Sequence, residues 1–213
     1  MSEPFTAGPL EPSEIEPAVQ IFLDSFHDNA AKVFGDNPKP DAMLDVWSFA
    51  QALEPGGFIA ARDGAGLLGY ALFTSSLSRL QRRALASGQV IVWALRALRG
   101  RYGIRWRNIA RQFWNKILFV GTARNFRTQG DAQLLNIAVA PAARDRGVAK
   151  SLLDAGMRYL AQRGVSEVRL EVQPQNAAAI AAYRGVGFEE KGRTRNAQGE
   201  WIVMTAKPKI GNG

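Results

Sequence analysis

The sequence predicts an α+β (α/β) fold, a sheet flanked by helices, and three stretches carry this prediction. Residues 134–139 are a strand-like apolar run that Pro141 ends, and a helical apolar periodicity begins after the glycine-containing loop that follows. Two β-like runs surround residues 63–66, a spacing typical of a hairpin. Residues 167–172 alternate charged and apolar side chains, as a half-buried strand does.

The N-terminal part predicts a strand and two helices before the hairpin. Residues 5–10 are a candidate short strand. Ser13 and Glu16 have the spacing of a capping box and predict the start of a helix. Its apolar face comprises Ile15, Ala18, Val19, Phe22, Leu23 and Phe26. The only histidine, His27, follows this helix and is expected to cap or pack rather than to catalyse.

A second helix is expected at 41–53, with Leu44, Trp47, Ala50 and Leu53 directed inward. The Pro-Gly-Gly sequence after it ends the helix. The hairpin is then expected to pair 58–62 with 67–74.

Residues 76–130 differ from the rest in charge. They contain 12 Arg and Lys and no Asp or Glu, so the remaining 15 basic and 19 acidic residues leave the rest of the chain at −4, against +8 for the whole. Residues 89–99 predict an apolar helix, and 106–118 predict a basic amphipathic helix with aromatic side chains on its apolar side. About fifty residues are too many for a structureless loop in a compact domain.

Composition bounds the chemistry. At 213 residues, with 46% hydrophobic and 22% charged residues, the chain is expected to form a single domain, 1–213, with 76–130 as a basic, aromatic-rich helical insertion. The absence of cysteine excludes disulfides, zinc–thiolate sites and a thiol nucleophile. No signal-peptide pattern and no apolar run of ~18 residues is seen, so the expected location is the cytoplasm.

The loop before the second-half helix has the residues of an anion site. Arg144, Asp145, Arg146, Gly147, Val148, Ala149 and Lys150 lie where the helix begins. The first turn of a helix carries unpaired backbone N–H groups, and small residues let a phosphate approach them. The loop is neither a Walker loop nor a G-x-G-x-x-G fingerprint. Taken alone, it fits a pyrophosphate site and an ordinary tight turn about equally.

The C-terminal part adds a second motif. After the strand at 167–172 come a short alanine-rich helix that starts at Asn176 and ends near Gly185, and a hairpin of 188–193 with 201–207. Tyr183 lies on the helix, and Gly187-Phe188 follows it.

Together the two motifs resemble those of the GCN5-related N-acetyltransferase (GNAT) family. The first motif is Asn-Ile-Ala-Val-x-Pro followed by Arg-x-x-Gly-x-Ala. The second is Leu-Glu-Val followed by the Asn, the Tyr and the Gly-Phe pair. Within this family, the second motif most resembles the ribosomal-protein N-terminal acetyltransferase branch. The resemblance covers about residues 131–207 and implies a GNAT-type mixed, mostly antiparallel twisted sheet flanked by helices. Ala149 stands where the family usually has a second loop glycine, and 76–130 has no counterpart in the usual pattern.

The resemblance also implies a site. Backbone groups of Ile137, Ala138 and Val139 would bind the pantetheine arm of acetyl-coenzyme A (acetyl-CoA), and the loop residues 144–150 would hold its pyrophosphate. Asn176 would contact the cofactor or brace its helix. Glu171 would act as the base and Tyr183 as the acid toward the thiolate, with no metal. The alternative for Glu171 is that it is an ordinary strand residue that faces solvent. The alternative for Tyr183 is that it only packs its helix beside Phe188.

The expected function is therefore acetyl-CoA-dependent N-acetylation of a primary amine on a small molecule, such as an amino sugar or a sugar nucleotide. One alternative is acetylation of protein N-terminal α-amines. Another is a non-catalytic acyl-CoA-binding module that docks a partner or membrane through 76–130. Three roles are open for this basic segment. Its helices could pack on the domain with their basic face in solvent, or the basic face could attract an anionic acceptor. It could also make peripheral contact with the inner face of the membrane. No groove-reading motif indicates a specific nucleic-acid partner, and the oligomeric state stays open.

Overall fold

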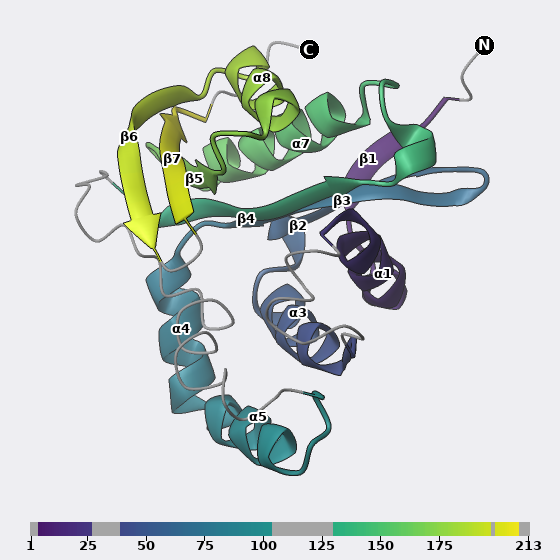
Figure 1. Cartoon of the computed structure of the whole chain (residues 1–213), viewed down its shortest axis with the longest axis vertical. Coiled ribbons are helices and arrows are strands. Elements are labelled where there is room, and N and C mark those ends of the chain that lie inside the picture. The colour runs from purple at the N-terminus through teal and green to yellow at the C-terminus, as the bar shows by residue number, and fades with distance from the viewer. Residues whose placement is uncertain (1–3, 27–38, 104–129, 197–198, 209–213) are drawn as a thin grey trace.

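A computed structural model describes residues 4–26, 39–103, 130–196 and 199–208. Its centre is a seven-stranded sheet of order β1-β2-β3-β4-β5-β7-β6 (Figure 1). All neighbours are antiparallel except β4 and β5, which run parallel. The strands are β1 Thr6–Pro9, β2 Phe58–Asp63, β3 Gly66–Thr74, β4 Ala132–Val139, β5 Val168–Val172, β6 Glu189–Asn196 and β7 Gly199–Ala206. The predicted mixed, mostly antiparallel sheet is confirmed.

Helices cover both faces of the sheet, with α1 and α3 on one face and α7 and α8 on the other (Figure 1). The α-helices are α1 Ile15–Ser25, α3 Asp41–Leu53, α4 Leu77–Ala86, α5 Gln89–Leu98, α7 Val148–Gln162 and α8 Ala177–Gly185. Short 3-10 turns lie at Pro12–Glu14, Pro55–Gly57 and Pro141–Ala143. The predicted helix at 106–118, His27 with its expected capping or packing role, the turn around 197–198 and the end of the chain lie outside the described residues.

Each face of the sheet has its own core. The α7 side buries apolar residues of β3, β4 and β5 together with Leu152, Leu153 and Leu160. The α1–α3 side buries Trp47 and Tyr70 among aliphatic side chains. Gly156 lets α7 lie close to the sheet, because a Cβ there would fall 2.0 Å from Cε2 of Phe73.

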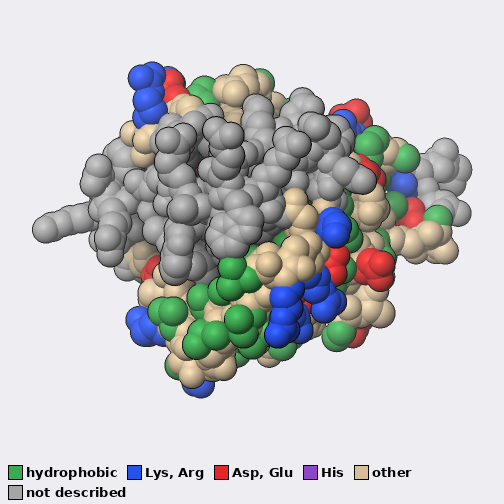
Figure 2. Space-filling model, turned by 60° about the horizontal axis from the view of Figure 1, so that its bottom comes forward, with side chains coloured by type: hydrophobic (Ala, Val, Ile, Leu, Met, Phe, Trp, Pro, Cys, Tyr) green, Lys and Arg blue, Asp and Glu red, His purple; other side chains and the backbone are tan. Residues whose placement is uncertain are grey.

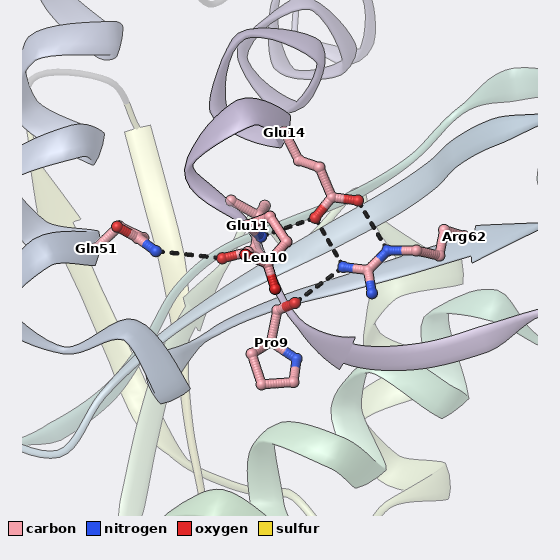
Figure 3. Close-up of polar contacts among 6 residues, drawn as sticks. All are labelled: Pro9, Leu10, Glu11, Glu14, Gln51 and Arg62. Carbon is pink, nitrogen blue, oxygen red and sulfur yellow. Dashed lines mark hydrogen bonds and ion pairs between the residues drawn. The ribbon is translucent and has the colours of Figure 1, made fainter.

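The start of α1 differs from the prediction. Glu14, not Glu16, reaches back to the preceding turn: its carboxylate accepts from the backbone N–H of Glu11 at 2.8 Å. The same carboxylate binds Arg62 of β2 through two bonds of 2.7 Å, while Arg62 also donates to the Pro9 carbonyl (Figure 3). Glu14 is thus the residue directly before α1, and its bidentate contact with Arg62 fixes the start of the helix against β2.

Helix α3 has the predicted bounds and joins several elements. Trp47 and Ala50 are buried as expected, whereas Leu53 is exposed. Gln51 is buried and donates to the Leu10 carbonyl (Figure 3). Beyond the helix end, the Glu54 carboxylate accepts from Thr74, the Ser75 N–H and the Tyr159 hydroxyl at 2.7–2.8 Å.

The segment between β3 and β4 starts and ends at one place. The Asp131 carboxylate accepts from the Ser76 hydroxyl at 2.9 Å and the Ser78 N–H at 2.6 Å, and its carbonyl accepts from Leu77 N–H. Helix α4 was not predicted from the sequence, and α5 follows it. The expected apolar face of α5 is only partly inward: Trp93 is buried, and Ile91, Leu95 and Leu98 are exposed.

Helix α5 is fixed against α3. The Trp93 ring packs edge-on against the Phe49 ring, with the ring centroids 5.5 Å apart. The Asp45 carboxylate accepts from Arg96 and from the Tyr102 hydroxyl, the latter at 2.6 Å. Arg101 pairs with Asp41 one turn away. Two partly buried carboxylates in the first turns of α3, those of Asp41 and Asp45, thus hold α5 and the residues after it in place.

Candidate active site where strands β4 and β5 diverge

Strands β4 and β5 pair only at their first residues. The ladder consists of Ala132 with Val168 and Gln133 with Arg169, and then stops. Beyond it, β4 stays paired with β3 up to Val139, and β5 stays paired with β7 up to Val172. The facing edges of β4 and β5 therefore carry backbone groups that no described strand satisfies, and such groups are available to a ligand.

The register identifies which groups of β4 face this divergence. The Ala140 N–H donates to the Leu68 carbonyl of β3 at 2.8 Å. In an antiparallel ladder, alternate residues bond to the partner strand, so Tyr70 with Ala138 is also a bonded pair. The N–H groups of Ile137 and Val139 then point the other way, toward β5.

A bulge in β4 changes which side chains share a face. Leu72 pairs with Asn136 and Phe73 with Leu134, so Leu135 is the extra residue. Leu134 and Ile137 contact the α7-side core, and Leu135 contacts the α1–α3 core. Asn136 lies on the α1–α3 side as well, where its Oδ1 accepts from the buried Tyr70 hydroxyl at 2.6 Å.

The loop that leads into α7 has an open backbone. Gly147 precedes the helix with φ of 79°, and Asp145 also has a positive φ of 61°. A Cβ at Gly147 would meet no atom within 4 Å. Val148 is buried and anchors the first turn, while Ala149 is half-buried. The free N–H groups at the start of this 15-residue helix are therefore not obstructed by a side chain at Gly147, as a phosphate-binding helix start requires.

The basic side chains of this loop are not all directed outward. Arg146 pairs with Asp63 of the β2–β3 hairpin at 3.2 Å, and the Asp63 carboxylate is almost fully buried. Lys150 pairs with Asp154 one turn along the helix at 2.7 Å. Arg144 is exposed. Arg146 thus links the loop to the hairpin, which sequence reasoning did not predict.

Helix α8 positions Tyr183. The Asn176 side chain caps the helix by accepting from the Ala179 N–H at 3.1 Å, so it braces the helix. The Tyr183 ring packs on Phe188 with centroids 5.9 Å apart. Its side chain is buried in the α7-side core, and this burial raises the pKa of the Tyr183 hydroxyl to about 12. The phenol therefore stays protonated at neutral pH.

Glu171 lies on the opposite face of β5. Val168, Leu170 and Val172 point into the α7-side core, so Arg169 and Glu171 point to the other side. The Arg169 guanidinium donates to the Glu171 carboxylate at 2.7 Å. Arg169 is 9% exposed and Glu171 is 25% exposed, so the carboxylate is held by a buried cation and still reaches solvent. Glu171 is more constrained than a freely solvated strand residue.

The divergence of β4 and β5 therefore separates two kinds of group. A carboxylate and an amide, Glu171 and Asn136, lie on the α1–α3 side, and a neutral phenol, Tyr183, lies on the α7–α8 side. Peptide N–H groups face the gap between the two strands. This arrangement can hold an extended acyl carrier between the strands, with its reactive carbonyl accessible from one side and its leaving group directed to the other.

A match to a protein-family model agrees with this geometry. Residues 19–188 match the acetyltransferase (GNAT) family, and this range includes β2 to β5, the loop before α7 and Tyr183. The chain belongs to the GNAT family of acetyltransferases.

Curated relatives match over shorter stretches. The [Ribosomal protein bS18]-alanine N-acetyltransferase of Escherichia coli (strain K12) is 44% identical over 66 residues, which are 31% of this chain and 45% of the relative. The mycothiol acetyltransferase of Nocardioides sp. (strain ATCC BAA-499 / JS614) is 50% identical over 52 residues, 24% of this chain and 18% of the relative. The chain thus spans less than half the length of these relatives.

Solved structures share the fold over the full chain. The structure titled "Crystal structure of SsHAT" has a TM-score of 0.70 at 22% identity and covers 96% of this chain and 98% of its own. A putative acetyltransferase from Salmonella typhimurium, yncA, with its cofactor acetyl-CoA, has a TM-score of 0.60 at 14% identity, covering 98% of this chain and 96% of its own.

Proposed function

We propose that this chain is an acetyl-CoA-dependent N-acetyltransferase that acetylates a primary amine of a small molecule, such as an amino sugar or a sugar nucleotide, by direct attack on the thioester. The observation that carries the proposal is the divergence of β4 and β5, with a carboxylate and a protonated phenol on opposite faces of the sheet beside it. Direct transfer needs a base on the acceptor side and a proton donor on the thiol side.

The chain's own residues fit the coenzyme. The free N–H groups of Val148, Ala149 and Lys150 at the start of α7, reached past Gly147, would hold the pyrophosphate, with Asp145 shaping the loop and Arg144 adding charge. Arg146 would act through its pairing with Asp63, which fixes the loop. Ile137 and Val139 would bind the pantetheine arm through the unpaired edge of β4, whereas the backbone of Ala138 is used by its pairing with Tyr70 and would only hold the strand in register. Asn176 would support α8.

Three proton and charge requirements then fall on named groups. Acetyl-CoA supplies an activated acetyl group as a thioester. An alkyl ammonium has a pKa of ~10.4, so the acceptor must first lose a proton, and Glu171 would take it through a bridging water. The N–H groups of Ile137 or Val139 would donate to the carbonyl oxygen as negative charge develops on it. Tyr183 would protonate the departing thiolate.

Asn136 adds a polar group to the acceptor side. Because its Oδ1 accepts from the buried Tyr70 hydroxyl, its amide nitrogen is left to donate to another group. Asn136 and Glu171 share this face, so an acceptor with an oxygen near its amine could bind both. Amino sugars have hydroxyl oxygens at such positions, and peptide N-termini have a carbonyl oxygen.

A protein N-terminal α-amine is the second candidate acceptor. The observation in its favour is the identity with relatives named for the alanine of ribosomal protein bS18. Against it, α4 and α5 add a basic unit, anchored at Asp131 beside the start of the β4–β5 ladder. The mycothiol acetyltransferases among the relatives show by name that the matched stretch also occurs with non-protein acceptors.

The test measures free thiol release from acetyl-CoA with a panel of amino sugars, sugar nucleotides and a peptide with an N-terminal alanine. A kcat/KM for one small amine at least ~100-fold above that of the peptide supports the proposal, since this ratio is ~2.7 kcal/mol of transition-state discrimination. The reverse ratio supports the protein acceptor. Calorimetric binding of coenzyme A with no release across the panel would instead indicate a non-catalytic acyl-CoA-binding module and contradict the enzyme.

A further inference from the structure

Helices α4 and α5 carry an exposed apolar surface. Within the described part of the chain, six large apolar side chains are exposed, and five of them lie on these two helices. We call these five the apolar patch: Leu85 (64% exposed), Ile91 (65%), Val92 (39%), Leu95 (46%) and Leu98 (55%). Such a concentration is unusual, because exposed apolar side chains on a monomer are normally scattered singly.

The attachment of α5 keeps this patch directed outward. Ile91, Leu95 and Leu98 fall on one side of the helix at steps of four and three, and Trp93 lies on the other side, buried against Phe49. The contacts of Arg96 and Tyr102 with Asp45 prevent the helix from rotating to bury the patch. The protein therefore orders an apolar stripe without covering it with the described elements.

The surroundings of the patch are cationic. Arg79, Arg82 and Arg83 are exposed on α4, and Arg99 is exposed directly after the end of α5. The whole segment 76–130 contains no acidic residue. Figure 2, which turns the bottom of Figure 1 forward, shows apolar side chains gathered directly beside a group of Lys and Arg side chains. The combination requires a partner that accepts apolar side chains and carries negative charge beside them.

We propose that the α4–α5 surface docks the protein on an anionic lipid bilayer. Apolar side chains would enter the headgroup boundary while the arginines bind lipid phosphates, as in interfacial amphipathic helices. None of the helices in the described part of the chain is long and apolar enough to cross a membrane. The proposed contact is with the surface of the bilayer.

A second copy of the chain fits this surface poorly. A two-fold dimer places the same patch on both sides of the interface. The arginines of the two copies would then meet, and residues 76–130 offer no carboxylate to compensate them. An anionic bilayer supplies that compensation throughout.

The experiment measures sedimentation of the full chain with vesicles of phosphatidylglycerol and phosphatidylcholine, and with vesicles of phosphatidylcholine alone. Binding is expected only to the anionic vesicles and is expected to fall with salt. The pair Ile91→Ser with Leu95→Ser should weaken it at least ~10-fold, because each side chain loses apolar burial. The pair Arg82→Gln with Arg83→Gln should weaken it ~25-fold, about fivefold for each arginine.

Control variants distinguish binding through this surface from nonspecific apolar adsorption and from an effect of net charge. Leu53→Ser removes the sixth exposed apolar side chain, which lies on α3, and Arg158→Gln removes an exposed arginine of α7. Both should bind vesicles as the unchanged chain does, and circular dichroism should show that every variant is folded. Absence of vesicle binding, equal loss in the controls, or patch variants that instead dissolve a dimer in size-exclusion chromatography would each overturn the proposal. Vesicle binding is measured independently of acetyl transfer, so a negative result would refute the membrane proposal without affecting the proposed enzymatic function.

Discussion

Tyr183 is the proposed acid, and the fold keeps its phenol neutral. Its ring lies on Phe188, and burial raises its pKa to about 12. Tyrosine hydroxyls elsewhere in the described chain donate to fixed acceptors: Tyr70 to Asn136, Tyr102 to Asp45 and Tyr159 to Glu54. No such bond to the Tyr183 hydroxyl is found among the described residues, so its proton remains available to a substrate.

Replacing Tyr183 by phenylalanine should therefore separate catalysis from binding. Tyr183→Phe keeps the ring packing and removes the proton donor, so kcat should fall ~10²-fold or more. Calorimetry should give an unchanged Kd for coenzyme A. Tyr159→Phe is the matched control, because it removes a partly buried hydroxyl bonded to Glu54, and its kcat should be retained. An unchanged kcat in Tyr183→Phe would remove this residue from the mechanism.

Glu171 has a structural partner, so its variant needs a readout that stability alone does not move. Glu171→Gln keeps the shape and leaves an amide to contact Arg169, and kcat should fall ~10²-fold if the carboxylate accepts the amine proton. The loss should shrink as pH rises, since more acceptor amine is already deprotonated. Glu189→Gln, an exposed change on β6, is the control. A pH-independent loss that tracks lowered thermal stability would assign Glu171 a structural role only.

Gly147 is the residue at which the proposed phosphate site can be blocked. Gly147→Glu places a carboxylate in front of the α7 N–H groups, and the Kd for coenzyme A should rise at least ~100-fold, a loss of ~3 kcal/mol. Gly164→Glu is the control, because Gly164 lies at the other end of α7 with φ of 70° and equally open surroundings. Both variants bear similar backbone strain, so equal affinities would refute the site.

At the level of helices and strands, local periodicity predicted most of the fold. The bounds of α3, the β2–β3 hairpin and the order strand, loop, helix around Gly147 follow from side-chain spacing and from Pro and Gly positions. Helix α4 was missed although Leu77, Leu80 and Ala84 have helical spacing and Ser76 caps it. Three arginines in ten residues make its apolar face narrow, and we therefore predicted no element there.

The site was predictable only where it is local. The loop 144–150 and the alternation at Glu171 are visible in consecutive residues. The pairings of Arg146 with Asp63 and of Tyr70 with Asn136 join residues 83 and 66 positions apart, so no local pattern predicts them. The Arg169–Glu171 pair spans two positions on one strand face, and this spacing could have identified it.

Packing of α7 on the sheet depends on the absence of one methyl group. In Gly156→Ala the new Cβ would overlap the fully buried Phe73 ring, and the free energy of unfolding should drop by ~1–3 kcal/mol. Gly185→Ala, in helix α8 with nothing within 4 Å of its Cβ, should be neutral or stabilising by ~0.4–1 kcal/mol. Urea midpoints of both variants check this, and equal midpoints would mean that Phe73 moves aside without cost.

The whole molecule should be sensitive to alkali, because each of its four tyrosines has a raised pKa. Burial is the main cause in every case, and Asp45 and Glu54 add to it for Tyr102 and Tyr159. In the unfolded chain these groups lose their protons near pH ~10. The folded state keeps these protons up to a higher pH than the unfolded chain does. The free energy of unfolding is therefore unaffected below pH ~10 and falls as pH rises from there through about 12, the pKa of Tyr183.

Titration of tyrosine absorbance near 295 nm, followed together with circular dichroism, measures this behaviour. Tyrosinate should appear in one cooperative step that coincides with loss of helix signal above pH ~10, because ionisation requires opening of both cores. Tyr183→Phe should shift that step to higher pH, since one of the four groups that favour the unfolded chain at high pH is gone. A gradual titration centred near pH ~10 with the helix signal intact would show that the tyrosines are solvated, and it would contradict the buried, neutral phenol that the proposed acid requires.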